Sequence, residues 1–165
     1  MKNLLICAAF ATGLAGFNAN AASAIEVENY ERAYELGNAA IKNENYDKAY
    51  THLRAASEMG NKVAQFSLAL MYMEGKGVKQ NYTEAYLWLN VASEADERKW
   101  RKVRDQIKDA LSEQQKVALQ PYVDDYLGKY GAEAQEVSCY KKAPTGSRIK
   151  RMTCVKQIDA HERRL

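Results

Sequence analysis

The histidines and serines of this chain show no spacing that is typical of a metal site or a nucleophile. The two histidines, His52 and His161, lie far apart, and neither has a second ligand at a metal-type spacing. Three serines of the central region, Ser57, Ser67 and Ser93, lack the Gly-x-Ser-x-Gly turn that exposes a serine nucleophile. The sequence therefore predicts no catalytic residue, no metal site and no cofactor.

Two cysteines are spaced to form a disulfide. Cys139 and Cys154 flank a segment without helical periodicity, and this segment contains Gly146 and Ser147, a pair suited to a two-residue type II′ hairpin turn. Opposing residues around this turn have numbers that sum to 293, and so do the two cysteines. The turn thus places them opposite each other, as a hydrogen-bonded pair with Cα atoms about 5.5 Å apart. A cysteine pair of this kind is typical of an oxidising compartment.

The segment around these cysteines is basic. Residues 136–165 carry eight Lys or Arg against three acidic residues, a net charge of +5, whereas the rest of the chain apart from Lys2 has a net charge of −3. Such a segment can attach a protein to a polyanion or to an anionic membrane surface. The candidate surface-targeting residues are Lys141, Lys142, Arg148, Lys150 and Arg151.

The N-terminus has the pattern of a secretory signal peptide. A positively charged start precedes the apolar run Leu4–Phe17, and two Ala-x-Ala cleavage motifs follow within 19–24. The run is shorter than the roughly 20 residues that span a bilayer. We therefore expect residues 1–24 to be removed, or 1–21 if the first motif is cleaved. The mature N-terminus is then Ile25 or Ala22, and the protein is periplasmic or secreted.

The composition of the chain indicates one small helical domain. The chain has 165 residues, of which 47% are hydrophobic and 27% charged, and it contains two prolines. These values exclude collagen, low-complexity disorder and a multi-domain enzyme. The net charge of +3 is too small to indicate a nucleic-acid partner.

The central region contains an internal repeat with an offset of 36 residues. Within each unit the apolar residues recur three, four and seven apart, which predicts amphipathic helices, and a period of this length is typical of solenoids. The matched pairs are Tyr46 and Tyr82, Ala49 and Ala85, Tyr50 and Tyr86, Leu53 and Leu89, Ala56 and Ala92, Ser57 and Ser93, and Glu58 and Glu94.

The two units resemble known helical repeats. The first contains Tyr46-x-x-Ala49-x-x-x-Leu53-x-x-Ala56 and is similar to a tetratricopeptide unit. The second contains Leu68-Ala69-x-Met71-Tyr72-x-x-Gly75-x-Gly77-Val78, then Ala85-x-x-Trp88-x-x-x-Ala92, and resembles the Sel-one-like repeat, a tetratricopeptide relative with a longer inter-helix loop. The resemblance covers about residues 29–96. It implies an all-α solenoid that binds a protein or peptide.

Two downstream helices are expected to close this solenoid. The first carries an apolar stripe from Trp100 to Leu111, and Ser112-x-x-Gln115 is a capping box that begins the second, which Pro121 should kink or end. The predicted fold class is all-α: a short tetratricopeptide/Sel-like helical repeat solenoid with a helical cap and a small C-terminal disulfide-closed β-hairpin. The predicted divisions are the signal peptide 1–24, the repeats 25–96, the capping helices 97–131 and the basic tail 132–165.

A candidate partner-binding surface lies on the first helix of the second unit. In tetratricopeptide-like stacks the first helix of each pair lines the concave face, and the core positions of the family leave Gln65, Phe66, Leu70 and Met73 facing elsewhere. The last three form an apolar stripe, and methionine suits adaptable peptide contacts. The alternative is that this stripe packs against the preceding helix pair.

Two classes of function are compatible with these features. The first is a protein–protein interaction or adaptor module in the bacterial cell envelope, as the resemblance implies. The second is targeting to a polyanion or a membrane surface through the basic hairpin. An enzyme is not expected, because the relatives credited with β-lactam binding carry a cysteine pair in each repeat and these repeats contain no cysteine.

Overall fold

The computed structural model describes residues 15–143 and 145–157, with side chains from residue 25 onward. None of the helices in this part of the chain is long and apolar enough to cross a membrane. The elements are α1 (Ala15–Lys42), α2 (Tyr46–Glu58), α3 (Lys62–Glu74), α4 (Tyr82–Ala92), the 3-10 helix η1 (Ser93–Ala95), α5 (Arg98–Ala110), α6 (Glu113–Tyr130), β1 (Val137–Lys142) and β2 (Arg151–Lys156).

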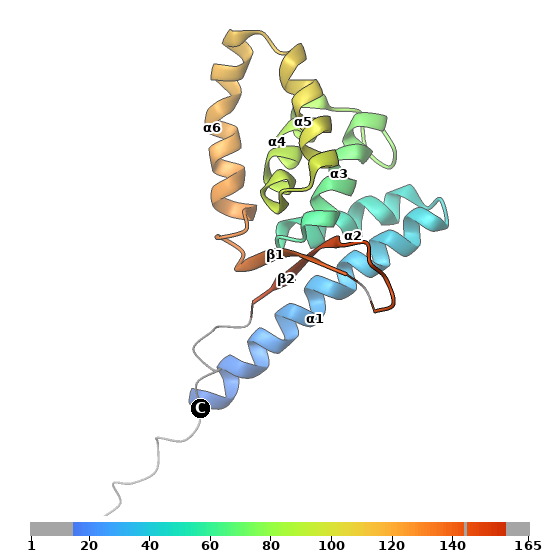
Figure 1. The fold of residues 1–165 in the computed structure, drawn as a ribbon, viewed down its shortest axis with the longest axis vertical. Helices are drawn as coiled ribbons and strands as arrows, with labels where there is room; N and C mark the ends of the chain where they lie inside the picture. Colours follow the sequence, from blue (N-terminus) through green and yellow to red (C-terminus); the bar gives the residue numbers. More distant parts are fainter. Residues whose placement is uncertain (1–14, 144, 158–165) are drawn as a thin grey trace, which may run out of the picture.

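The helices form a short solenoid. α1 packs against α2 and α3 against α4, and the two pairs are joined through α2 and α3 (Figure 1). α5 and α6 diverge and each packs against α4, so that they cover the last face of the stack. The predicted all-α repeat fold with two closing helices is thereby confirmed.

The residues that cap the N-termini of the helices also recur at an offset of 36. The side chains of Asn45 and Asn81, which are 36 residues apart, accept hydrogen bonds from backbone N–H groups in the first turns of α2 and α4. Asn61 and Glu97, again 36 apart, do the same for α3 and α5. Each helix therefore satisfies part of its unpaired N-terminal donors locally, before any tertiary packing.

Small residues line the contacts between the repeat helices. Ala49 and Ala56 of α2 and Ala85 and Ala92 of α4 are fully buried, which lets neighbouring helices approach closely. Trp88 of α4 packs against Tyr126 and Tyr130 of α6, with ring centroids 5.2 Å and 5.0 Å away. The closing helix α6 thus contributes aromatic area to the core of the second pair.

Pro121 was expected to kink or end its helix, and the structure contradicts the second alternative. The capping box of Ser112 and Gln115 is present as predicted, but α6 continues through Pro121 to Tyr130. Pro121 is exposed, and so is Val117, whose carbonyl would accept the missing hydrogen bond. Water can satisfy that carbonyl, while the buried side of the helix keeps its contacts with α4.

The C-terminal hairpin has the predicted register but a longer loop. Cys139 pairs with Cys154 across the two strands and is joined to it by a disulfide. The ladder ends at Lys142 and Arg151, so the loop is 143–150 and the predicted two-residue turn at Gly146 is wrong. The Cα atoms of the cysteines are 4.0 Å apart, nearer a non-hydrogen-bonded pair than the predicted spacing, because a long loop does not fix the phase of the ladder.

Candidate interaction surface

Gln65 does not line a binding surface. Its side chain is fully buried, and Nε2 donates hydrogen bonds of 2.9 Å to the carbonyl oxygens of both Ser57 and Tyr130. The prediction for Gln65 is therefore wrong. The physical reason is that the C-terminal end of α6 folds back over this position of α3, and the repeat pattern contains no sign of that contact.

The apolar stripe on α3 is half-buried rather than open. Phe66 stacks on Trp100 of α5, with ring centroids 5.1 Å apart and ring planes 15° apart. Met73 packs against the core of the second helix pair, while Leu70 is half-buried. The stripe therefore divides into a packed end at Phe66 and a partly accessible end at Leu70 and Met73.

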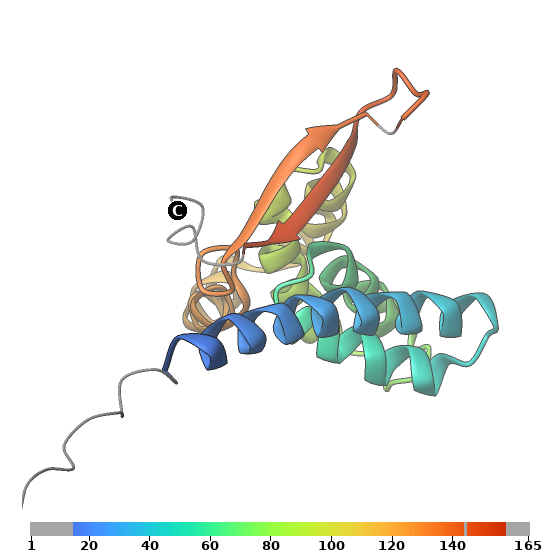
Figure 2. The same cartoon turned by 90° about the horizontal axis from the view of Figure 1, so that it is seen from below.

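The hairpin packs against the same cluster as the Phe66 end of this stripe. Cys139, Met152 and Cys154 lie on one face of the hairpin and pack against the cluster that contains Phe66 and Trp100. Figure 2 shows the two strands running from beside α1 across the stacked helices, and they pack near the start of α3, the end of α4 and the start of α5. A segment of the same chain thus occupies part of the face that the repeat resemblance assigns to partners.

Contacts at the base of the hairpin tie it to the first helix pair. Val137 lies against Gly60, where φ is +89° and any Cβ would collide with the side chain of Gln135. Lys156 Nζ lies 2.8 Å from Glu26 Oε1 of α1 and donates to the carbonyl oxygen of Gln135 at 3.1 Å. The hairpin therefore holds a defined position against α1 and against the turn between α2 and α3.

A buried polar cluster sets the direction in which the chain leaves α6. Lys62 of α3 is fully buried, and its Nζ donates to Glu94 Oε2 at 2.8 Å and to the carbonyl oxygen of Tyr130 at 3.4 Å. Glu94 Oε2 also accepts from the backbone N–H of Ala132 at 2.8 Å. Burial lowers the pKa of Lys62, and the hydrogen bond that Lys62 donates to Glu94 opposes that shift. Sequence reasoning missed this cluster.

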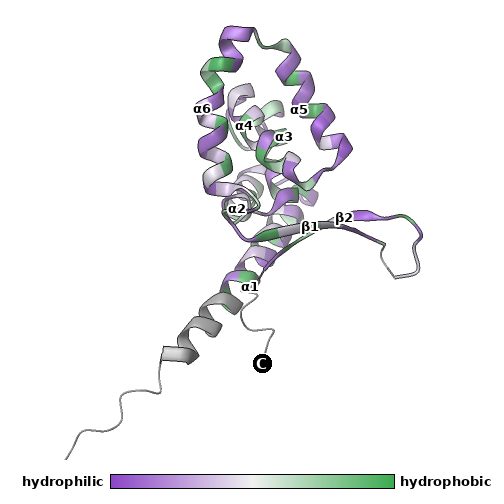
Figure 3. Ribbon diagram, turned by 60° about the vertical axis from the view of Figure 1, so that its left-hand side comes forward, coloured by the Kyte–Doolittle hydropathy of each residue, from purple (hydrophilic) through white to green (hydrophobic). Residues whose placement is uncertain are grey.

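The predicted surface-targeting residues all lie in solvent. Lys141, Lys142, Arg148, Lys150 and Arg151 are exposed, and within the described part of the chain none of them forms a salt bridge. The loop that joins the two strands stands clear of the helices (Figures 2 and 3). The hairpin therefore presents a positively charged end that the helical body does not neutralise.

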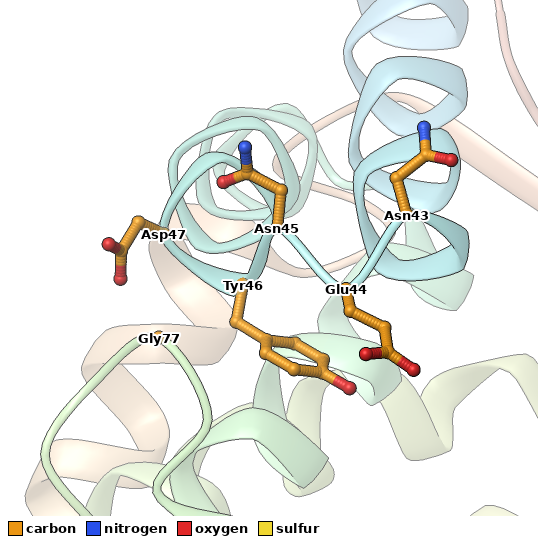
Figure 4. A pocket seen from close by; sticks show the side chains of 6 residues that line it. All are labelled: Asn43, Glu44, Asn45, Tyr46, Asp47 and Gly77. Carbon is orange, nitrogen blue, oxygen red and sulfur yellow. The ribbon is translucent and has the colours of Figure 1, made fainter.

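A polar pocket of about 480 Å³ lies at the opposite ends of the helices. Its walls are the turn between α1 and α2 and the loop between α3 and α4 (Figure 4). Gly77 brings this loop against the carbonyl of Tyr46 with φ at +67°, where a larger residue would overlap it. The lining has carboxylates and amides, and it contains no nucleophile beside a base. The lining residues are Asn43, Glu44, Asn45, Tyr46, Asp47 and Gly77.

Comparison with known proteins identifies the repeats. Residues 29–61 and 62–97 each match the model of the Sel1 repeat, so the match includes both units. The crystal structure of c5321, a protective antigen present in uropathogenic Escherichia coli strains and displaying an SLR fold, is similar, with 28% identity and a TM-score of 0.55. The match covers 62% of this chain and 23% of that one. No curated protein matches. Residues 29–97 of the chain therefore form two consecutive Sel1 repeats.

Proposed function

We propose that the protein is a protein-interaction module of the bacterial cell envelope. Sel1 repeats generally mediate protein–protein interactions, and residues 29–97 form two of them. The observation that carries the proposal is the division of the α3 face. Phe66 stacks on Trp100, in the cluster against which the hairpin also packs, whereas Leu70 and Met73 lie outside that cluster and are only half-buried. A partner that binds this free part needs no displacement of the hairpin.

Site-specific crosslinking tests this proposal. A photo-reactive amino acid replaces Leu70 in cells, and the matched control carries it at Val117 of α6, which is 74% exposed. We expect a discrete adduct from position 70 that disappears when Met73→Asp is added. Adducts of equal yield from both positions, or from the control alone, would contradict a partner on the α3 face.

Export through a cleaved signal peptide is the second part of this proposal. The apolar N-terminus supports it, and so does the disulfide, because such bonds persist in oxidising compartments. Cleavage before Ala22 or Ile25 would also preserve the contacts of Glu26 and Tyr30 with the hairpin. We expect N-terminal sequencing of protein from its native compartment to read one of these two starts. An intact Met1 would contradict export.

A second candidate function is attachment to a polyanion through the hairpin. It is favoured by one observation: residues 137–157 contain six Lys or Arg and no acidic residue. Binding of this kind should weaken steeply with added salt, because dissolved ions screen each contact between a basic side chain and the polyanion. Binding to the partly apolar surface around Leu70 should depend on salt only weakly.

A further inference from the structure

The end of the hairpin combines positive charge with an exposed apolar side chain. Ile149 is 73% exposed, and it stands in the loop between Arg148 and Lys150. Lys142 and Arg151 pair with each other at the last step of the ladder, so their charges lie beside the start of the loop. A large aliphatic side chain at the extremity of the molecule has no role in the core of this fold.

The outward face of the hairpin continues this pattern. Residues on a strand alternate between two faces, and the register places Cys139 and Cys154 on the face that packs against the body. Their neighbours Tyr140 and Val155 therefore point outward, where they are 44% and 38% exposed. The outward face thus carries apolar and aromatic side chains between its base and its charged end.

We propose that the hairpin docks on an anionic phospholipid bilayer. Lys142, Arg148, Lys150 and Arg151 bind the lipid phosphates, and Ile149 enters the headgroup region. This inference rests on the second candidate function and names its ligand. A soluble polyanion would gain from the charges but not from burying Ile149, whereas an interface between headgroups and acyl chains gains from both.

The charge distribution of the whole molecule favours one orientation at such a surface. The rest of the chain, apart from Lys2 and residues 136–165, has a net charge of −3 and is repelled by an anionic bilayer. The hairpin loop stands clear of that body and can reach a flat surface first (Figure 3). Lys156 at the other end of the hairpin lies against Glu26 and does not take part. The repeats would thus face away from the lipid and stay accessible.

Co-sedimentation with vesicles tests the charge contribution. The disulfide-intact mature chain is mixed with vesicles of phosphatidylcholine, with or without 40% phosphatidylglycerol, at low and high salt. We expect binding only to the anionic vesicles, and a loss of about 100-fold in partition for Arg148→Gln, Lys150→Gln, Arg151→Gln, since each basic residue near such a surface contributes about fivefold. The control Lys42→Gln, Lys48→Gln, Lys79→Gln removes the same charge from exposed positions of the body and should retain binding.

Substitution of Ile149 tests the apolar contribution at constant charge. Ile149→Ser should lower partition into anionic vesicles by about fivefold because it removes the buried apolar area. Ile149→Trp should retain or increase it, and the emission of the introduced indole should shift to the blue when vesicles are added. The two native tryptophans are 3% and 9% exposed, so they should contribute little to that shift. Heparin binding should be the same for both variants and the wild type.

Any other result of these experiments contradicts a specific part of the proposal. Salt-sensitive binding to heparin without binding to anionic vesicles would overturn the bilayer inference and leave the second candidate function standing. Binding to neither would overturn both. Equal losses in the hairpin variant and the body control would show a non-specific charge effect and overturn the hairpin as the site. An unchanged partition for Ile149→Ser would overturn the assignment of lipid over a soluble polyanion.

Discussion

The helical body and the hairpin are stabilised in different ways. The repeat helices α2, α3 and α4 each have an N-terminal cap, and their buried alanines and leucines pack against the neighbouring helix. The hairpin is a two-stranded sheet closed by one disulfide, and it packs one face against the cluster of Ala92, Ala95 and Trp100. Two strands alone are marginal in water, so the hairpin depends on its disulfide and on the body. The body does not depend on the hairpin to the same degree.

The sequence also specifies the two regions differently. The body is specified repeatedly, by matched residues 36 positions apart, and a substitution in it should affect the whole cooperative unit. The hairpin is specified once, by the register of two cysteines, and a substitution in it should act locally. Perturbations placed in the body, at the junction and in the hairpin can therefore test whether the two regions unfold together.

The largest effect is expected at the junction between the two regions. Glu94→Ala should lower the free energy of unfolding by about 3 kcal/mol, because it leaves Lys62 buried without its carboxylate and Ala132 N–H without its acceptor. Urea denaturation measures the change. The repeat position equivalent to Glu94 is Glu58, whose pair with Arg54 is largely exposed, so Glu58→Ala should cost less than about 0.5 kcal/mol. Equal losses for both variants would remove the buried cluster as the junction.

Overpacking of the repeat contacts should come next. Ala56 and Ala92 are fully buried at equivalent positions, and a leucine at either would force the helices apart. We expect Ala56→Leu and Ala92→Leu each to destabilise the protein by about 1–3 kcal/mol, seen as a lower melting temperature. The rate at which a reductant opens the Cys139–Cys154 disulfide should not change below that temperature. An unaltered melting temperature for both variants would contradict the close packing of the repeats.

Opening the disulfide should affect mainly the hairpin. Closing this loop stabilises the paired strands by about 3 kcal/mol on chain-entropy grounds. The double variant Cys139→Ser, Cys154→Ser should keep its helical circular dichroism and lose less than about 1 kcal/mol in the main transition. Proteolysis at Lys141, Lys142, Lys150 and Arg151 should accelerate.

Trp100 provides a second readout of the same variant. It is 9% exposed and packs against the hairpin and Phe66, so its fluorescence should shift to the red as the hairpin loosens. Two titratable thiols in wild-type protein purified in air would show that the bond is absent. Loss of the main transition would show that the body depends on the hairpin.

The features that sequence reasoning identified are those with a local or periodic cause. The matched residues of the two units predicted the helix pairs, and Ser112 with Gln115 predicted the start of α6. The cysteine register was predicted because side-chain alternation fixes which residues face each other. The loop length was wrong, since Gly146 takes the positive φ that such a turn requires without closing the ladder.

The contacts between distant segments could not be predicted in this way. Gln65 lies on the helix surface that the repeat leaves open, and it is buried by the end of α6, 65 residues later. Nothing in its own sequence neighbourhood differs from an exposed glutamine. The same holds for Lys62, whose partner Glu94 lies in η1, directly after α4. Phe66 stacks on Trp100 of α5 and not on the preceding helix pair, a contact that the periodicity of its own helix does not indicate.

The smallest effect is expected at the contact between α1 and β2. Tyr30 is buried, and its hydroxyl donates to the carbonyl oxygen of Cys154 over 3.5 Å, a long hydrogen bond. Tyr30→Phe keeps the ring, so near pH 8 it should cost about 0.5 kcal/mol or less. Slightly faster proteolysis of the hairpin should accompany this change, because one tie to α1 is lost. Denaturation in urea at pH 8 measures the first effect.

The wild type should have the larger free energy of unfolding near pH 8, and Tyr30→Phe should have the larger one in alkali. Burial, and then the nearby Glu31 carboxylate, raises the pKa of Tyr30 from 10.0 to about 12. A raised pKa means that the neutral phenol stabilises the folded state fully below pH 10 and that this contribution is lost as the pH rises to 12. The wild type should therefore lose unfolding free energy more steeply than Tyr30→Phe over this interval, while the other tyrosines affect both chains equally. Parallel losses would mean that water reaches the Tyr30 hydroxyl, and that the hairpin does not seal the N-terminal part of α1.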